Sequence, residues 1–347
     1  MKRKIETWKI VLTLVGFVAA LLAVFAVTQI IEAKSRQEVV VTREAYQSQG
    51  NQKSLRLYGT EYTYDHDFET YLFLGTDGSG NEEGEGEDYI GSMADFLGLL
   101  ILDNTDQTYA LLQLNRDTIA QMHVLDWKDE GEATAKQQLC MAHAYGGSKE
   151  KGCENTMDAV SQLLGHLPMD GYYALSMNDL PQLNHAIGGV TLTVQDDLTA
   201  ADPALKKGAT VTLTDRQVEI YARERYALGD GENLGRMERQ KQLLTAFAER
   251  FREAGSQNAG FALQVFHELE QLATSDINGK TFSSLTKKLS NYTDRGIYSF
   301  AGTTELVESA VDGIEHMRFY PEETSVIDIM TELFGLGSNE ENKGEKK

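Results

Sequence analysis

The chain has 347 residues, 41% of them hydrophobic, so it is long enough to bury one large core or two ordinary ones. It carries 53 acidic and 32 basic residues, and this formal net charge of -21 disfavours nucleic-acid binding, which depends largely on basic side chains. Its only two cysteines, Cys140 and Cys153, exclude a multiply disulfide-bonded scaffold.

The N-terminus predicts a membrane anchor. Residues 1–9 begin Met-Lys-Arg-Lys, and residues 10–31 form an uncharged apolar run, long enough for a helix to cross a hydrocarbon core of roughly 30 Å. A cleavable signal peptide has a shorter apolar region that ends in small residues. We therefore expect an uncleaved transmembrane helix in the cell membrane, with the N-terminus in the cytoplasm and the main domain outside. Residues 32–54 are polar and aperiodic and are expected to form a stalk.

Residues 55–335 are expected to form one extracytoplasmic domain that opens with a β-hairpin. Leu55–Tyr64 alternates apolar and polar residues around Gly59, as short hairpins do. Thr70–Leu74 is a compact apolar run that predicts a buried strand, and Asp77 follows its carboxyl end. Ligands of open α/β sheets bind at such strand ends, so Asp77 is a candidate metal ligand, although an Asp next to a Gly is often only a turn former.

A second hairpin is predicted from the apolar runs at 96–102 and 109–114. Asp95 comes just before the first run, and the second run ends in a polar group that contains Arg116. Magnesium in phosphate sites takes one or two carboxylates together with phosphate oxygens and water, so Asp95 is a second candidate ligand. Taken singly, Asp95 and Arg116 are more typical of structural roles than of a ligand site.

A glycine-containing loop at 142–147 precedes a helix that we expect to begin near Glu154. Cys140 and Cys153 bracket this loop, and outside the cell a disulfide between them is an open possibility that sequence alone does not decide. His143 has no partner at a recognisable metal-ligand spacing, so we expect a structural, hydrogen-bonded histidine.

The stretch from 214 to 252 predicts two helices joined by a sharp turn. Thr214 and Gln217 form a capping box for a helix that begins near Asp215, and a second helix begins near Gly235. Arginines flank the turn: Arg223, Arg225, Arg236 and Arg239. Arginine offers a planar, permanently charged fork for phosphate oxygens, and helix N-termini add N–H donors, so the layout suits a phosphate or pyrophosphate. Acidic residues in the same stretch leave a surface salt-bridge lattice as the alternative.

Strands and helices alternate from about 70 to 252, with further strands expected at 191–194 and 210–213. This alternation predicts an α/β fold, a three-layer α/β/α sandwich with a central mixed sheet. The C-terminal part predicts helices at 259–273, 279–291 and 324–334, an extended piece at 297–301 and a disordered tail at 336–347.

Seven short motifs follow the predicted span in a fixed order. They are Leu-Phe-Leu-Gly-Thr-Asp77, Ala-Asp95, Asn-Arg116-Asp117-Thr, Ala-His-Ala-Tyr145-Gly-Gly, Ile-Gly188-Gly189-Val, Ala-Arg223-Glu-Arg225-Tyr and Gly-Arg236-Met-Glu-Arg239-Gln240. Each is weak alone, but in this order they resemble the LytR-CpsA-Psr family of bacterial envelope proteins. The resemblance covers about residues 55–255.

This resemblance implies a transferase that moves a polyprenyl-pyrophosphate-linked glycopolymer, of the teichoic acid or capsule type, onto peptidoglycan. The residues that it implies for holding the pyrophosphate are Arg116, Arg223, Arg225, Arg236, Arg239 and Gln240. Those that it implies for catalysis are Arg116, Arg223, Arg225 and Arg236, with Asn233 at a position where the family usually has an aspartate. It implies Mg²⁺ at Asp77 and Asp95, bridging the phosphates. The strands near 70–74, 97–102 and 109–114 would wall a slot for the lipid chain.

Three positions depart from the family pattern. Met93 and Gln138 stand where many members have an arginine and a lysine. Asn233 cannot act as a general base, although Asp230 or Glu232 in the same turn could shift into that role. The departures favour an alternative, a non-catalytic protein of the same fold that binds polyprenyl phosphates or organises the envelope. A phosphatase would need the same arginines, whereas a transcription regulator fits poorly with the charge of the chain and its lack of a helix-turn-helix pattern.

Overall fold

The computed structural model describes residues 53–80, 90–124, 133–224, 233–257, 271–277, 291–308 and 315–338, with single residues between the later ranges. The predicted transmembrane helix at 10–31 and nearly all of the predicted stalk lie outside these residues. Within the described part of the chain, no helix combines the length and the apolar character needed to span a membrane.

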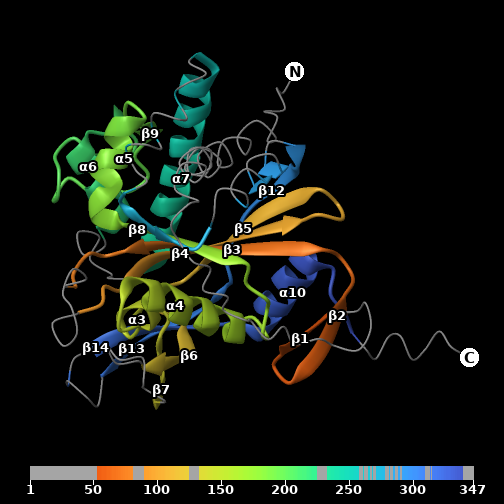
Figure 1. Ribbon diagram of the computed structural model, residues 1–347. Coiled ribbons are helices and arrows are strands. Elements are labelled where there is room, and N and C mark those ends of the chain that lie inside the picture. The colour runs from red at the N-terminus through yellow and green to blue at the C-terminus, as the bar shows by residue number, and fades with distance from the viewer. Residues whose placement is uncertain are drawn as a thin grey trace, which may run out of the picture.

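A six-stranded mixed sheet lies at the centre of the molecule (Figure 1), in the order β11-β8-β3-β4-β5-β12. Its strands are β3 (Phe68–Thr76), β4 (Ala94–Asp103), β5 (Thr108–Leu114), β8 (Gly171–Ser176), β11 (Ala273–Ser275) and β12 (Thr293–Tyr298). The antiparallel neighbours are β3 with β4, β4 with β5, and β8 with β11, whereas β3 with β8 and β5 with β12 are parallel. The predicted hairpin and the mixed α/β fold with a central mixed sheet are thus confirmed.

Helices cover both faces of this sheet, which explains why its strands read as nearly continuous apolar runs. One group is α5 (Leu180–Ala186), α6 (Asp215–Arg223) and α7 (Asn233–Gln257), and the other is α3 (Met141–Ala144), α4 (Lys149–Leu163) and α10 (Glu323–Phe334). Figure 1 shows the two groups on opposite sides of the sheet. Leu100 and Leu102 of β4 belong to the core under α5–α7, and Leu97 and Leu99 belong to the core under α4 and α10. Side chains on both faces of β4 therefore contribute to the two cores.

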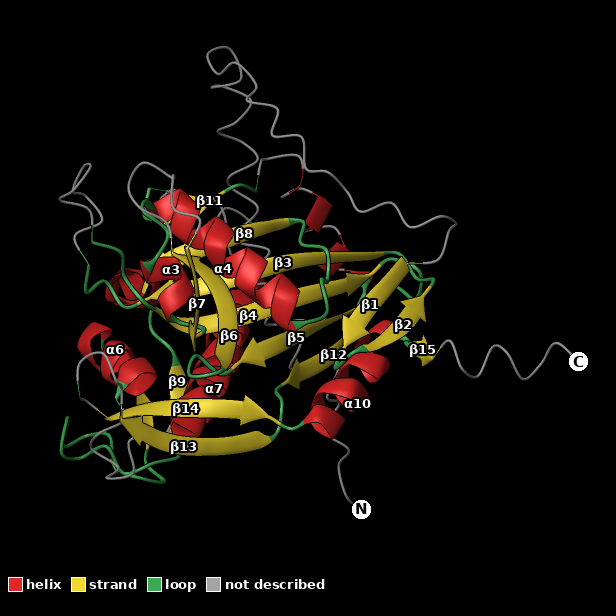
Figure 2. Ribbon diagram, turned by 90° about the horizontal axis from the view of Figure 1, so that it is seen from below, coloured by secondary structure: helices red, strands yellow, loops and turns green. Residues whose placement is uncertain are grey.

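Four small sheets surround the central one. They are β1 (Lys53–Leu57) with β2 (Thr60–Tyr64) and β15 (Gly337–Ser338), β6 (Ile119–Val124) with β7 (Ala133–Gln138), β9 (Thr191–Thr193) with β10 (Thr210–Thr212), and β13 (Gly302–Glu308) with β14 (Glu315–Pro321). The predicted hairpin around Gly59 is confirmed, and the strands expected at 191–194 and 210–213 pair with each other. Figure 2 shows β13 and β14 as a hairpin beside the central sheet, which the sequence did not predict.

Three expectations need correction. The helix α4 begins at Lys149, because the Ser148 side chain accepts a hydrogen bond from the Lys151 amide and caps it, so a start near Glu154 is wrong. The helix expected at 259–273 cannot extend to its predicted end, because 273–275 forms β11. Residues 337–338 of the predicted disordered tail pair with β2. By contrast, α10 confirms the helix expected at 324–334.

Candidate functional site

A β-bulge places Asp95 at the edge of the sheet where β3 ends. Gly75 of β3 pairs with Phe96, but the next residue, Thr76, pairs with Ala94, so Asp95 is an extra residue with no partner in the ladder. Such a bulge redirects a side chain that regular pairing would send to the core. The strand ends are tied together, since the Asp77 amide donates to the Met93 carbonyl at 2.8 Å. The two predicted carboxylates therefore lie on adjacent strand ends.

Asp95 is the shared partner of two buried arginines from different elements. Its Oδ1 accepts hydrogen bonds from Nη1 of Arg116, which follows β5, and from Nη1 of Arg236 on α7, the latter at 3.2 Å. All three residues are at most 8% exposed. Burial opposes the charge of Arg116, but its buried thiol and carboxylate neighbours outweigh burial, so its pKa lies above its ordinary value. The site therefore holds two fixed positive charges around Asp95, and a second carboxylate, Asp117 Oδ1, lies 3.9 Å from Arg116 Nε.

Asn233 joins this network at the first position of α7. Its Oδ1 accepts from Arg236 Nε at 2.8 Å, and its Nδ2 donates to Asn115 Oδ1 at 2.8 Å. Asn115 Oδ1 also accepts from the Asp117 amide at 3.0 Å, which fixes which end of its amide faces Asn233. Asn233 is 3% exposed. An asparagine is thus suited to this position, because the side chain here donates one hydrogen bond and accepts another.

Arg223 approaches the same sheet edge from the end of α6. The predicted capping box of Thr214 and Gln217 is present and fixes where this helix begins. Nη2 of Arg223 donates to the Asp77 carbonyl at 3.0 Å, and its Nη1 donates to Asn178 Oδ1 at 2.8 Å and to Glu219 Oε1 at 3.0 Å. Its side chain is 29% exposed, so unlike Arg116 and Arg236 it faces solvent in part.

Gly78 permits the close approach of the Asp77 turn to Asn178. Its φ of +64° lies in the left-handed region, and a Cβ there would lie 2.2 Å from Asn178 Nδ2. The sequence did not single out Gly78 or Asn178, because a glycine beside an aspartate has no signal beyond that of an ordinary turn.

Arg239 does not join the arginine cluster, contrary to its assignment from the sequence. Its side chain is 0% exposed, and its nitrogens donate to the Tyr221 carbonyl at 3.1 Å, to Asp196 Oδ2 at 2.9 Å and to the Glu224 carbonyl. It therefore secures the C-terminal end of α6, whose last carbonyls need donors. Arg225 lies outside the described residues.

An apolar pocket opens beside this polar group, between the sheet and helices α5–α7. Its apolar lining includes Phe73, Phe96, Leu100, Leu111, Tyr173, Met177, Leu180, Leu243, Leu244, Phe247 and Ile297. Gln240 also lines it, one helical turn after Arg236, and its amide is held by Gln113 Nε2 and the Ala222 carbonyl, each at 3.2 Å. Residues of β3, β4 and β5 therefore wall the pocket, as the sequence predicts for a lipid slot.

The donor set at the strand ends fits a hard divalent cation. Asp77 Oδ1 is occupied by the Ser79 amide and hydroxyl and the Met93 amide, at 2.8–3.1 Å. In the described part of the chain, Oδ2 of Asp77 and Oδ2 of Asp95 accept no hydrogen bond. Two carboxylate oxygens on neighbouring strand ends suit Mg²⁺, which completes its shell with water or phosphate oxygens.

The remaining sequence candidates are structural. Cys140 and Cys153 are both free and buried, so no disulfide joins them. Cys140 Sγ instead accepts from Arg116 Nη2 at 3.0 Å, a contact that no motif indicated, and burial raises its pKa against the opposing effect of Arg116. Gln138, in place of the family lysine, donates to Asp117 Oδ1 at 3.3 Å and to the Met317 carbonyl. His143 is hydrogen-bonded to the Ser92 carbonyl, as expected of a structural histidine.

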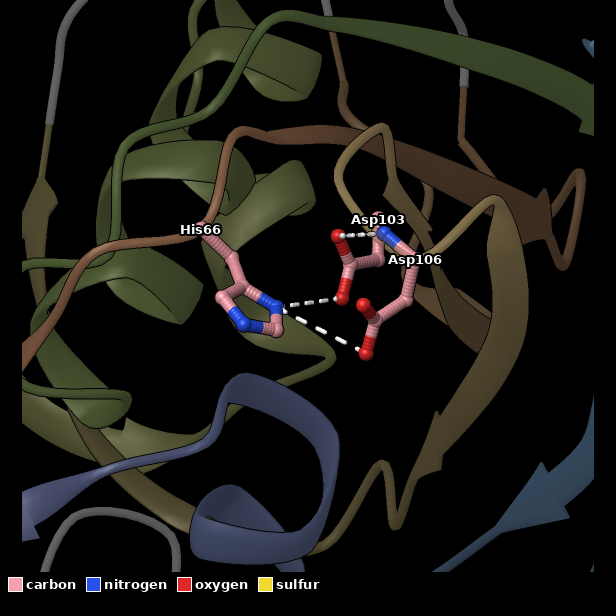
Figure 3. Close-up of side chains that lie close together, drawn as sticks. All are labelled: His66, Asp103 and Asp106. Carbon is pink, nitrogen blue, oxygen red and sulfur yellow. Dashed lines mark hydrogen bonds and ion pairs between the residues drawn. The ribbon is translucent and has the colours of Figure 1, made fainter.

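A second polar cluster lies at the opposite ends of β3 and β4. His66 Nδ1 is 2.8 Å from Asp103 Oδ2 and 4.0 Å from Asp106 Oδ2 (Figure 3). Asp103 Oδ1 accepts from the amides of Thr105 and Asp106, so the carboxylate also shapes the β4–β5 turn. The cluster joins two turns and lies away from the arginines.

The comparisons with known proteins fit this geometry. Residues 28–333 match the model of the LytR_cpsA_psr family. The chain belongs to this family. One relative, the polyisoprenyl-teichoic acid–peptidoglycan teichoic acid transferase TagV of Bacillus subtilis, is 28% identical over 171 residues, which are 47% of this chain and 40% of that protein. The aligned part is therefore less than half of that relative.

Solved structures of the family share the fold. The B. subtilis TagV structure matches with a TM-score of 0.57 and 20% identity over 77% of this chain and 96% of that one. TagT bound to LI-WTA matches with a TM-score of 0.54 and 20% identity over 78% and 91% of the two chains. At such identity the likeness shows the fold alone.

Proposed function

We propose that the chain is a phosphotransferase that moves a polyprenyl-pyrophosphate-linked glycopolymer, of the teichoic acid or capsule type, onto peptidoglycan. The observation that supports this is the junction of two unlike surfaces: the apolar pocket is lined by Ala222, next to Arg223, and by Gln240, one helical turn after Arg236, which shares Asp95 with Arg116. A prenyl pyrophosphate has the same division into a long apolar chain and a doubly charged head. The transferase activity of family relatives agrees with the proposal at the family level.

The arginines would bind the pyrophosphate and neutralise the charge that develops on it. Arg116 and Arg236 are held in place by Asp95 before any ligand binds, so little reorganisation is needed. Arg223 is more exposed and would close over the outer phosphate. Mg²⁺ held by Asp77 and Asp95 would supply further neutralisation of the phosphate charge.

In the transfer, an acceptor hydroxyl of the glycan attacks the phosphorus that carries the polymer. The new phosphodiester bond forms as the bond to the second phosphate breaks, and prenyl phosphate leaves. Asn233 cannot take the hydroxyl proton. Since phosphoryl transfer depends mainly on positioning and charge stabilisation, water can accept that proton. In this proposal the predicted span at 10–31 anchors the domain at the external face of the cell membrane, where the lipid-linked substrate lies.

The decisive experiment incubates the full-length chain in detergent with lipid-linked polymer, peptidoglycan oligomers and Mg²⁺, and detects the polymer–glycan adduct by mass spectrometry. Arg116→Ala should abolish the adduct, and Arg223→Ala should weaken lipid retention at least about tenfold, because a charge-assisted hydrogen bond is worth about 1.5–3 kcal/mol. Arg216→Ala is the matched control, since Arg216 is an exposed arginine on the same helix, α6, as Arg223.

Asn233 favours one alternative, a protein that binds the lipid-linked polymer without transferring it. Retention of the lipid by the wild-type chain with no adduct, under conditions in which a family transferase produces one, would select this alternative. Failure to retain the lipid at all would contradict both.

A further inference from the structure

The pocket extends along the sheet away from the arginines and ends at a polar pair. Gly75 of β3 and Phe96 of β4 line the pocket at the end near the arginines, and Tyr109 lines it near the start of β5. Leu97, the residue after Phe96, pairs with Leu114, and the five residue steps from Leu114 back to Tyr109 span roughly 17 Å at the rise of a β-strand. There the Tyr109 hydroxyl donates to Asp294 Oδ2 at 2.8 Å, and both residues line the pocket.

Asp294 is the one acidic residue among the described residues that line the pocket. It sits at a bulge of β12, where Asp294 pairs with Tyr109 but the next pairing joins Ile297 to Leu111. Gly296, with a φ of +98°, allows this bulge, and its amide donates to Asp294 Oδ1. Burial raises the pKa of Asp294 to about 6, although both hydrogen bonds favour its charged form. The carboxyl is therefore held in place but poorly solvated.

No described cation offsets the charge of Asp294. The elements packed around it contribute the Tyr109 hydroxyl from β5 and the apolar side chains of Leu243 and Phe247 from α7. The cations on the adjoining segments are already engaged: Lys288 pairs with Glu69, and Arg295 pairs with Glu332 at 3.5 Å. The Tyr109 hydroxyl and the Gly296 amide are then the described donors to the ionised carboxyl, and water that enters the pocket supplies the rest of its solvation.

An apolar chain that fills the pocket would displace this water. An ionised carboxylate left against hydrocarbon is costly, whereas a protonated carboxyl is much less so. We propose that Asp294 makes the filling of this pocket proton-linked, so that an apolar chain binds with uptake of a proton and binds more tightly when this carboxyl is neutral. The inference rests on the proposed function, in which this pocket holds the prenyl chain.

The direction with pH follows from linkage. The bound chain raises the pKa of Asp294 above its value of about 6 in the free protein. The full affinity is thus present below about pH 6 and is lost as the pH rises through the pKa of the bound state. A further rise of about one unit would make binding about tenfold tighter at pH 5 than at pH 8.

The test uses farnesol, a prenyl alcohol that does not titrate in this range, with the full-length chain in detergent. Calorimetry at pH 5, 6.5 and 8, in two buffers of different ionisation enthalpy, gives the affinity and the number of protons taken up. The wild type should bind about tenfold more tightly at pH 5 than at pH 8 and take up about half a proton per bound farnesol near pH 6.5. Asp294→Asn should bind tightly at every pH with no proton uptake, and its thermal melt reports whether it folds.

Two further variants keep the test decisive. Asp179→Asn is the matched control, because burial also raises the pKa of Asp179 but this residue does not line the pocket, so the pH dependence should persist. Tyr109→Phe removes a donor that favours the ionised carboxyl, so the pH range over which affinity is lost should move to higher pH. This variant still tests the proposal if Asp294→Asn fails to fold. Wild-type binding that is flat with pH overturns the proton linkage alone. Absence of farnesol binding at every pH overturns the lipid slot and with it the proposed function.

Discussion

Two arginines three residues apart on α7 serve different regions of the molecule. Arg236 faces the sheet edge, where it shares Asp95 with Arg116 and contacts Asn233. Arg239 faces α6, where it binds two backbone carbonyls and Asp196. Both are almost fully buried, at 2% and 0% exposed, so burial does not separate them. The difference lies in the partners.

The partners determine what each arginine can still do. Arg239 donates to two backbone carbonyls at the end of α6, where carbonyls lack partners within the helix, and its role is complete without a ligand. Arg236 and Arg116 share Asp95, and Asp117 Oδ1 lies 3.9 Å from Arg116 Nε, so carboxylates at the sheet edge hold both guanidinium groups beside the pocket. A pyrophosphate at this edge would compete with these carboxylates for the arginine N–H groups, whereas the donors of Arg239 are engaged at the end of α6.

The largest expected effect tests this contrast directly. Arg239→Met should lower the free energy of unfolding by about 3 kcal/mol, because it leaves Asp196 and two carbonyls without their buried donor. At temperatures where the variant is folded, it should still bind inorganic pyrophosphate. Arg236→Met, three residues earlier on the same helix, should lose that binding. Urea denaturation measures the free energy of unfolding, and calorimetry measures pyrophosphate binding. Loss of pyrophosphate binding in folded Arg239→Met would contradict the separate roles of Arg239 and Arg236.

A smaller effect is expected at Asn233. In Asn233→Asp, a carboxylate oxygen would face Asn115 Oδ1, which is held in place by the Asp117 amide, so two acceptors would meet in a buried site. The expected loss of stability is about 1–3 kcal/mol, the cost of an unsatisfied buried group. Asn233→Ser, which can still donate, should lose less. An aspartate variant as stable as the wild type in urea would show that the side-chain amide of Asn115 can flip to present its NH₂ group.

The smallest effect is expected at an ion pair far from α7. The pKa of His66 is raised, first by its hydrogen bond to Asp103, against the effect of burial, and then by the nearby carboxylates. The pair should therefore stabilise the protein below about pH 6.5 and lose this effect as the pH rises through the folded-state pKa. The side chain is 30% exposed, so at most about 1 kcal/mol is expected. His66→Asn should flatten this part of the stability profile.

Local signals in the sequence predicted the local structure. The capping box at Thr214 and the turn at Gly59 depend on neighbours a few residues away, and both are present. The sequence also placed Asp95 and Arg116 next to the ends of predicted strands. Their direct contact did not follow from the sequence, because it requires the bulge at Asp95, which has no sequence signature.

Long-range contacts account for what the sequence did not reveal. Arg239 matches a motif as well as Arg236 does, and only the fold shows that Asp196 lies beside it. The β13–β14 hairpin is rich in exposed polar residues, so no clean apolar alternation marked it. Cys140 pairs with an arginine because β4 and β5 bring Arg116 to it, a contact that cysteine spacing cannot encode.

The pairing of β15 with β2 has a consequence for how the chain is made. Gly337 pairs with Thr63, and the Thr63 hydroxyl donates to the Gly337 carbonyl across 274 residues of sequence. During synthesis the β1–β2 hairpin lacks its third strand until residues 337–338 have been made. Contacts of such sequence separation form late and slow folding. A chain truncated before residue 337 should therefore leave this edge of β2 unpaired and more open to proteolysis.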